Sequence, residues 1–171
     1  MELGPHNASL VVKTYREGVA AKAGHDLVIE VERWQATVDL DAGVVELSAD
    51  PRSLAIREGV RGVKPLTDKD RGEIRKNIDE KVLGGQPIEF RSRAASMDAS
   101  RLAVEGELTM AGATRPLSAA LDAGAGRVTA TIPLRQTEWG IKPYRGLMGA
   151  LKVRDELEIV FDSTLGGVGP G

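Results

Sequence analysis

The sequence predicts an all-β protein, an antiparallel barrel of about eight strands with one surface helix inserted at about residues 67–83. Three observations support this prediction. Apolar and polar residues alternate with a period of two along most of the chain, as in strands that bury one face. Short turns that contain glycine separate these runs. A helical spacing is clear in one segment, where Ile74, Ile78 and Val82 recur every fourth residue.

The clearest strand pair lies between Arg101 and Leu121. The apolar residues of its two arms share one face: Leu102, Val104, Leu108, Met110, Leu117, Ala119 and Leu121. The turn between the arms, residues 111–114, contains Gly112, which adopts positive φ without a steric penalty. We therefore expect a β-hairpin with one face toward a core, and we take it as the unit that the sheet repeats.

Four strands are predicted before the helix. They span residues 8–16, 25–34, 35–40 and 44–50. Pro51 ends the fourth strand because proline has no backbone N–H to donate to a neighbouring strand. Residues 51–66 show no clean period and are interpreted as a long irregular connection.

Capping residues mark the start and the end of the predicted helix. Thr67 is a good N-cap, and Asp70 stands three residues later, as in a capping box. Gly84 and Gly85 follow the last apolar residue and predict the helix end. The apolar stripe is narrow and the other face is charged, so we expect this helix to lie on the surface of a larger body.

The sheet is predicted to continue after the helix, with an irregular segment before the last strand. Beyond the hairpin, strands are expected at residues 87–94, 127–135 and 153–164. The irregular segment, residues 136–151, contains Trp139 and Tyr144, which either shape the mouth of a barrel or plug one end. We expect one domain over residues 1–165 and a flexible tail at 166–171. A closed up-and-down barrel and a two-layer sandwich both satisfy the periodicity.

Composition excludes several classes of function. With 23 basic and 25 acidic residues, the net charge is −2, which argues against binding to nucleic acid. Zero cysteines exclude disulfides and thiolate chemistry. No run approaches the roughly 20 apolar residues of a transmembrane helix. The first six residues have neither the basic nor the apolar region of a secretory signal, so we expect a cytoplasmic protein.

The sequence predicts neither a catalytic group nor a metal site. His25 and Asp26 are adjacent, and adjacent residues of a regular strand point to opposite faces, which prevents them from acting as a dyad. A metal site needs three or four converging ligands, and the chain has two histidines and no cysteine. The motifs of serine hydrolases, P-loop proteins and zinc proteases are missing. We therefore expect a protein that is not an enzyme.

Several sequence motifs resemble the YceI-like family. Residues 106–117, Gly-Glu-Leu-Thr-Met-Ala-Gly-Ala-Thr-Arg-Pro-Leu, are similar to the family's hairpin, in which Gly-x-Leu-Thr precedes Gly-x-Thr-(basic)-Pro. Residues 86–91, Gln-Pro-Ile-Glu-Phe-Arg, resemble its strand in which a proline precedes an aliphatic residue and a Phe. Residues 139–141, Trp-Gly-Ile, with 153–159 resemble its aromatic loop and closing strand. The resemblance covers nearly the whole chain and implies a lipocalin-like barrel that binds polyisoprenoids.

We expect the inward apolar residues to line a ligand site. The candidate lining residues are Leu27, Ile29, Val31, Val38, Phe90, Leu108, Met110, Ile132, Leu134 and Trp139. A barrel of about eight strands either is filled by side chains or holds one small ligand. The implied ligand is an isoprenoid, a quinone or another long apolar lipid, with no further cofactor. Five basic residues either meet a ligand head group or are plain surface charges: Arg71, Arg75, Lys76, Lys142 and Arg145.

Two other functions stay open at this point. One is a structural or stress-related barrel with a filled core that acts through its surface. The other is an enzyme that uses His25 or a carboxylate inside the cavity. A homodimer is also left open.

Overall fold

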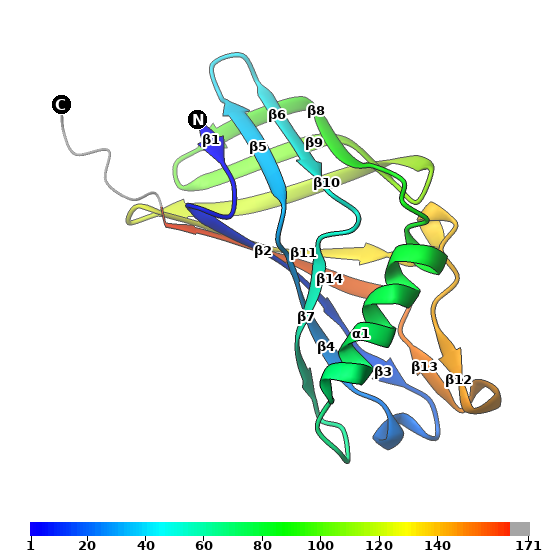
Figure 1. Cartoon of the computed structure of the whole chain (residues 1–171). Coiled ribbons are helices and arrows are strands. Elements are labelled where there is room, and N and C mark those ends of the chain that lie inside the picture. The colour runs from blue at the N-terminus through cyan, green and yellow to red at the C-terminus, as the bar shows by residue number, and fades with distance from the viewer. Residues whose placement is uncertain (165–171) are drawn as a thin grey trace.

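The computed structural model describes residues 1–164, and the predicted tail at 166–171 lies outside this range. An eleven-stranded antiparallel sheet curls into a half-barrel, and helix α1 lies along its open side (Figure 1). The strands of this sheet are β1 (Glu2–Leu3), β2 (Ala8–Thr14), β4 (Asp26–Val31), β5 (Trp34–Asp39), β6 (Val44–Ala49), β7 (Leu54–Val60), β8 (Ile88–Asp98), β9 (Arg101–Met110), β10 (Ala113–Gly124), β11 (Arg127–Arg135) and β14 (Glu156–Thr164).

The remaining elements lie near one end of the half-barrel or beside α1. A small three-stranded sheet contains β3 (Arg16–Glu17), β12 (Arg145–Gly146) and β13 (Leu151–Val153). The helical elements are α1 (Asp68–Asn77), the π-turn η2 (Ile78–Val82) that continues it, and the short 3₁₀ turns η1 (Ala21–Ala23), η3 (Gln136–Trp139) and η4 (Leu147–Gly149).

The strand count corrects the prediction of about eight. Among the described residues, the large sheet has the order β1-β5-β6-β8-β9-β10-β11-β14-β2-β4-β7. Three runs of chain bend, and each contributes two strands: β1 with β2, β4 with β5, and β6 with β7. Of these strands, β1 and β7 were not predicted from the sequence. After the bend, β4 pairs with β2 and β7, whereas β5 pairs with β1 and β6. Bending therefore places two halves of one hairpin at opposite ends of the sheet order.

Ser53 holds the corner where the β4–β5 run and the β6–β7 run bend. Its carbonyl accepts a hydrogen bond from Glu32 N at 2.8 Å, and its Oγ accepts one from Arg33 N at 3.1 Å. The Ser53 hydroxyl also lies 2.8 Å from the carbonyl oxygen of Asp50. The residue is fully buried. These bonds satisfy backbone groups that the bend removes from the ladder, as buried polar groups require.

Residues 54–60 contradict the interpretation of 51–66 as an irregular connection. They form strand β7, which pairs with β4 from Val31–Leu54 to Asp26–Val60. Leu54 and Ile56 are buried and Ala55 is half-buried, so a strand alternation is present but short. The strand was not predicted because Gly59 and Gly62 are typical of turns, which favoured the interpretation as an irregular connection.

Helix α1 begins with the predicted capping box. The hydroxyl of Thr67 accepts a hydrogen bond from Asp70 N at 3.1 Å, and the Asp70 carboxylate accepts one from Thr67 N at 2.9 Å. These bonds hold the pKa of Asp70 below its usual range, the backbone bond contributing most. Gly84 and Gly85 then take positive φ values of 60° and 69°, which confirms the predicted stop.

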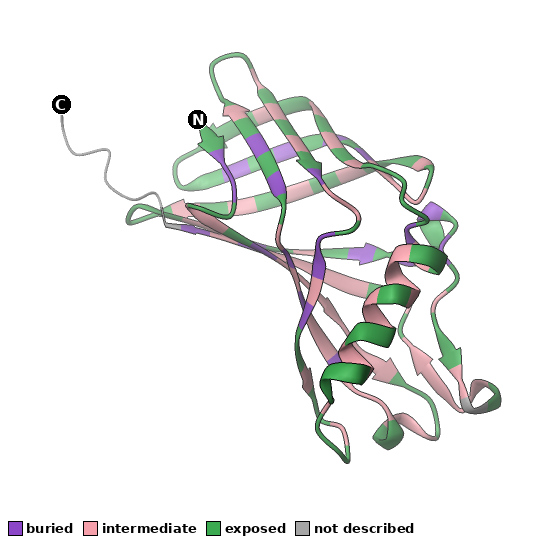
Figure 2. Ribbon diagram, viewed as in Figure 1, coloured by how far each residue is buried: buried purple, intermediate pink, exposed green. Residues whose placement is uncertain are grey.

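The predicted hairpin is present as β9 and β10, with its apolar residues on one face. Leu121 pairs with Leu102, and Ala119 pairs with Val104. The turn is shorter than predicted: Ala111 and Gly112 alone form it, with φ values of 51° and 78°. Two positive φ values are typical of the type I′ turn, whose twist matches that of the flanking strands. In β9 buried and exposed residues alternate without a break from Arg101 to Leu108 (Figure 2).

Candidate ligand-binding site

A cavity of about 1130 Å³ occupies the interior of the half-barrel. Its wall is built from inward side chains of the large sheet on one side and from α1 and η2 on the other. Aliphatic side chains dominate this wall. Its volume slightly exceeds the roughly 300–1,000 Å³ of pockets that hold drug-sized ligands. The cavity is therefore suited to a large apolar molecule.

Nine of the ten side chains proposed from the sequence lie on the cavity wall. They are Leu27, Ile29, Val31, Val38, Phe90, Leu108, Met110, Ile132 and Leu134. Leu27, Val38 and Ile132 point inward and pack against the core cluster, yet they stay half-buried because they also face the cavity. Binding of a ligand to these side chains stays a prediction.

Trp139 is the exception, because it does not line the cavity. Its side chain is 2% exposed and packs with Leu108, Leu134 and Ile141 in a second apolar cluster. Its indole Nε1 donates a hydrogen bond to the carbonyl oxygen of Leu108 at 2.8 Å. Both the apolar ring and the polar tip are thus satisfied inside the protein. Of the two functions weighed for this residue, the structure favours the plug.

Helix α1 and its continuation η2 contribute more to the site than a surface helix would. Ile74, Ile78 and Val82, the stripe visible in the sequence, face the cavity. Glu73 and Lys76 lie beside them on the wall. This apolar stripe could have indicated a cavity-lining helix, but because it is narrow it was interpreted as the contact of a surface helix with a larger body. The half-barrel thus receives a wall that is apolar at its centre and charged along its margin.

Polar side chains are concentrated along this margin. They include Asp70, Glu73, Lys76, Asn77, Glu80 and Lys81 from the helical segment and His25 from the start of β4. The basic residues considered for a head group are not all there: Lys76 lines the cavity, whereas Arg75 donates a hydrogen bond to the carbonyl oxygen of Arg52 at 2.8 Å. A polar margin around an apolar interior fixes which end of an amphipathic ligand stays near water.

His25 and Asp26 face opposite sides of the sheet, as the strand period predicts. The His25 ring lies against the cavity, and its Nε2 contacts the carbonyl oxygen of Lys64. Asp26 lies on the outer side, where its carboxylate accepts a hydrogen bond from Arg16 N at 2.8 Å. The two side chains therefore cannot exchange a proton directly.

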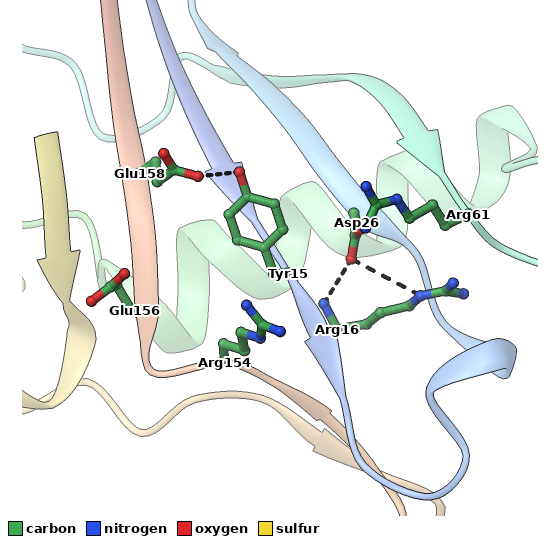
Figure 3. A pocket seen from close by; sticks show the side chains of 7 residues that line it. All are labelled: Tyr15, Arg16, Asp26, Arg61, Arg154, Glu156 and Glu158. Carbon is green, nitrogen blue, oxygen red and sulfur yellow. Dashed lines mark hydrogen bonds and ion pairs between the residues drawn. The ribbon is translucent and has the colours of Figure 1, made fainter. Parts of the chain in front are cut away.

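A second, smaller pocket of about 370 Å³ lies at the outer side of the sheet (Figure 3). Its lining residues are Tyr15, Arg16, Asp26, Arg61, Arg154, Glu156 and Glu158. Opposite charges pair within it: Arg61 Nη1 lies 3.5 Å from Asp26 Oδ2. Tyr15 donates a hydrogen bond to the Glu158 carboxylate, which raises the pKa of the phenol. These groups satisfy one another, so the pocket has the character of a structural network.

Residues 1–164 contain neither a membrane-spanning helix nor a cluster of metal ligands. No helix in that range is long and apolar enough to cross a membrane. Within the same range, no three His, Asp or Glu side chains gather as metal ligands would.

Comparisons with known proteins match the YceI-like domain to residues 12–165, which is most of the chain. The chain belongs to the YceI-like family. The comparison with curated proteins found no match. Among solved structures, the chain is similar to BcnA of Burkholderia cenocepacia, with a TM-score of 0.64 at 14% identity over 91% of this chain and 94% of that one.

The YceI protein of Campylobacter jejuni is a second similar structure. It has a TM-score of 0.54 at 10% identity, and the match covers 78% of this chain and 81% of that one. A variant of the same protein that holds monobromobimane as a guest has a TM-score of 0.57. At these identities the similarity establishes the fold, which in this YceI-like chain is the curled antiparallel sheet described above.

Proposed function

We propose that this YceI-like protein binds an isoprenoid or a similar long apolar lipid in the cavity and has no catalytic activity. The observation that supports this most is the volume of about 1130 Å³ inside a largely aliphatic wall. Transfer of a lipid tail from water to such a wall is favourable by roughly 0.8 kcal/mol per buried methylene. A tail of many methylenes and few polar atoms gains most from this site.

The arrangement of polar groups supports a ligand with one polar end. Lys76 and Lys81 lie on the cavity margin, where an anionic or quinone-type head group would find donors. The centre of the wall, by contrast, carries side chains such as Ile29 and Leu134. Selectivity for the tail would then depend on its length and width rather than on hydrogen bonds. Transport or storage of the lipid is the function that follows.

As part of this proposal, the curled sheet closes into a barrel of eight runs of chain. The β4–β5 run and the β6–β7 run form one hairpin that bends at the Ser53 corner, and its two halves lie at the two ends of the sheet order. When each bent run is counted once, all eight runs of chain have a neighbour on both sides. Such an arrangement leaves few unpaired strand edges. Residence in the cytoplasm stays a prediction from the sequence.

The alternative, a filled barrel that acts through its surface, is less well supported. A filled interior would leave no cavity large enough for a lipid. The catalytic alternative depends on His25, which faces the cavity without Asp26. In a His25→Ala variant we expect lipid binding to be retained, because the apolar wall is unchanged. Loss of binding in that variant would favour a direct role for the imidazole.

Native mass spectrometry of freshly purified protein, with extraction of bound lipid, tests the proposal. We expect an apolar mass that co-purifies, or uptake of an added prenyl lipid. In an Ile132→Trp variant the indole fills part of the cavity, so uptake should fall by about tenfold or more. Thr131→Trp is the matched control, since Thr131 is the exposed neighbour on the outer face. Absence of both a bound mass and uptake would exclude the proposed function.

A further inference from the structure

Three segments of the chain meet at one end of the half-barrel. They are residues 18–24 around η1, residues 60–66 between β7 and α1, and residues 143–152 around β12 and η4; together we call them the loop end (Figure 1). Contacts join the segments. Ala20 N donates a hydrogen bond to the carbonyl oxygen of Ala150 at 2.8 Å, and His25, next to the first segment, contacts Lys64.

Large apolar side chains are exposed on all three segments of the loop end. The most exposed one of each segment is Val19 at 97%, Val63 at 73% and Met148, which is fully exposed. Met148 has a positive φ of 54°, a conformation that costs energy for a residue other than glycine. Exposure of these apolar side chains to water is unfavourable. Exposed apolar groups gathered at one end of a protein mark an interaction surface.

The charge of the loop end is of one sign. Its three segments contain five basic residues and no acidic residue: Lys22, Arg61, Lys64, Arg145 and Lys152. Arg61 is paired with Asp26 of the neighbouring strand, so the other four carry the surplus. The whole chain, by contrast, has 23 basic and 25 acidic residues. The basic surplus is therefore local. Apolar side chains flanked by Lys and Arg are the composition that binds the interface of an anionic membrane.

We propose that the loop end docks on an anionic lipid membrane, with Val19, Val63 and Met148 inserted between the head groups. This inference concerns the outer surface and does not require the cavity to hold a lipid. It complements the proposed function, because Gly24, Leu66 and Leu151 of the loop end also line the cavity. A docked molecule would thus have its cavity directed toward the bilayer.

Co-sedimentation with vesicles tests the docking. We expect the wild-type protein to sediment with vesicles of phosphatidylcholine and phosphatidylserine in equal parts and not with vesicles of phosphatidylcholine alone. Added salt should weaken the binding, because it screens the basic residues. A protein that stays in the supernatant with both kinds of vesicle would overturn the proposal.

Two variants and two matched controls identify the surface. The triple variant Val19→Ser, Val63→Ser, Met148→Ser should bind anionic vesicles at least about tenfold more weakly. Val44→Ser is its control, since Val44 is an exposed apolar residue at the start of β6. Lys22→Glu with Lys64→Glu should abolish binding. The control is Arg93→Glu with Arg115→Glu, two exposed residues on β8 and β10. This control changes the net charge by the same amount and should leave vesicle binding intact.

Two further outcomes are decisive. If the controls lose as much binding as the variants, the loop end is not the docking surface. If the wild-type protein is a dimer that the triple variant dissociates, the apolar side chains serve self-association and the proposal is wrong. Circular dichroism establishes that each variant is folded. Lipid uptake, measured on the same proteins, keeps failure of the docking distinct from failure of the proposed function.

Discussion

At the scale of single residues, a few positions are determined by close approach or burial rather than by propensity. Gly106 is one, because an added Cβ would lie 2.2 Å from the carbonyl oxygen of Arg91 and 2.7 Å from Cζ of Phe90. It stands opposite Ser92, where a bulge shifts the register between β8 and β9. Ser53 is another, since its hydrogen bonds complete a corner of the sheet. Neither role is visible in an alternation pattern.

We expect Gly106→Ala to destabilise the protein by roughly 1–3 kcal/mol, since backbone must move to admit the methyl group. Denaturant unfolding measures the change. Gly124→Ala is the matched control: Gly124 lies at the end of β10, and its added Cβ would meet nothing within 4 Å. Equal stability of Gly106→Ala and the wild-type protein would contradict the close contact.

Tyr15 predicts a dependence of stability on pH at the alkaline end. Its hydrogen bond to Glu158 raises the pKa of the phenol above the ordinary value of 10.0. A pKa that is higher in the folded state contributes stability below pH 10 and loses it as the pH rises through the raised value. The difference in unfolding free energy between the wild-type protein and Tyr15→Phe should be constant near neutral pH and should shrink above pH 10. A difference unchanged by pH would exclude this bond as its source.

At the scale of elements, helix α1 is the least firmly held wall of the cavity. None of its residues is fully buried, and Gly72 lies near its middle. Isolated helices of this length are marginal in water, so the helix depends on its caps and on the stripe that includes Ile74. The strands opposite are fixed by continuous ladders, as in the hairpin of β9 and β10. Motion of the cavity wall is therefore expected first in α1.

Thr67→Ala should weaken α1 by roughly 0.5–2 kcal/mol, because it removes the hydroxyl that accepts from Asp70 N. Hydrogen exchange should become faster in α1 and stay unchanged in β9 and β10. Gly72→Ala should act in the opposite direction by about 0.5–1 kcal/mol, since its added Cβ would meet nothing within 4 Å. If hydrogen exchange in α1 were the same in both variants, neither the N-cap nor the helix propensity of residue 72 would determine the stability of this helix.

At the scale of the whole molecule, the inward apolar faces are packed in two clusters but enclose an open cavity. One apolar cluster contains Leu10, Ile29 and Phe161, and the other contains Trp139 and Ile141. The volume between the inward faces remains open. The protein therefore has packed regions that stabilise it and an unpacked interior that leaves apolar surface for a ligand. Occupation of that interior should add to stability.

A lipid that binds the folded state alone should raise the melting temperature. At a ligand concentration of a hundred times Kd the stabilisation is about 2.7 kcal/mol. For a domain of this size each kcal/mol corresponds to about 2–4 °C, so we expect a rise of roughly 5–10 °C. Calorimetry of delipidated protein with and without an added prenyl lipid measures it. Ile132→Trp should reduce the rise, and an unchanged melting temperature in the wild-type protein would contradict binding.

Much of the local structure could be predicted from the sequence because it depends on near neighbours. The alternation in residues 101–121 predicted the hairpin and its inward face, and Thr67 with Asp70 predicted the helix start. Most of the inward side chains followed from the same period of two. The motif at residues 106–117 indicated the family that the domain match confirms. Each of these features is encoded within a few consecutive residues.

The tertiary structure alone decided what depends on contacts distant in sequence. The bend at Ser53 and the strand at 54–60 require pairing partners that a local pattern does not identify. Trp139 was placed in a core by its bond to Leu108, 31 residues away. The curvature that opens the cavity and gathers Val19, Val63 and Met148 at one end also arises from the whole sheet. Periodicity determines which face of a strand is apolar, whereas long-range packing determines what that face encloses.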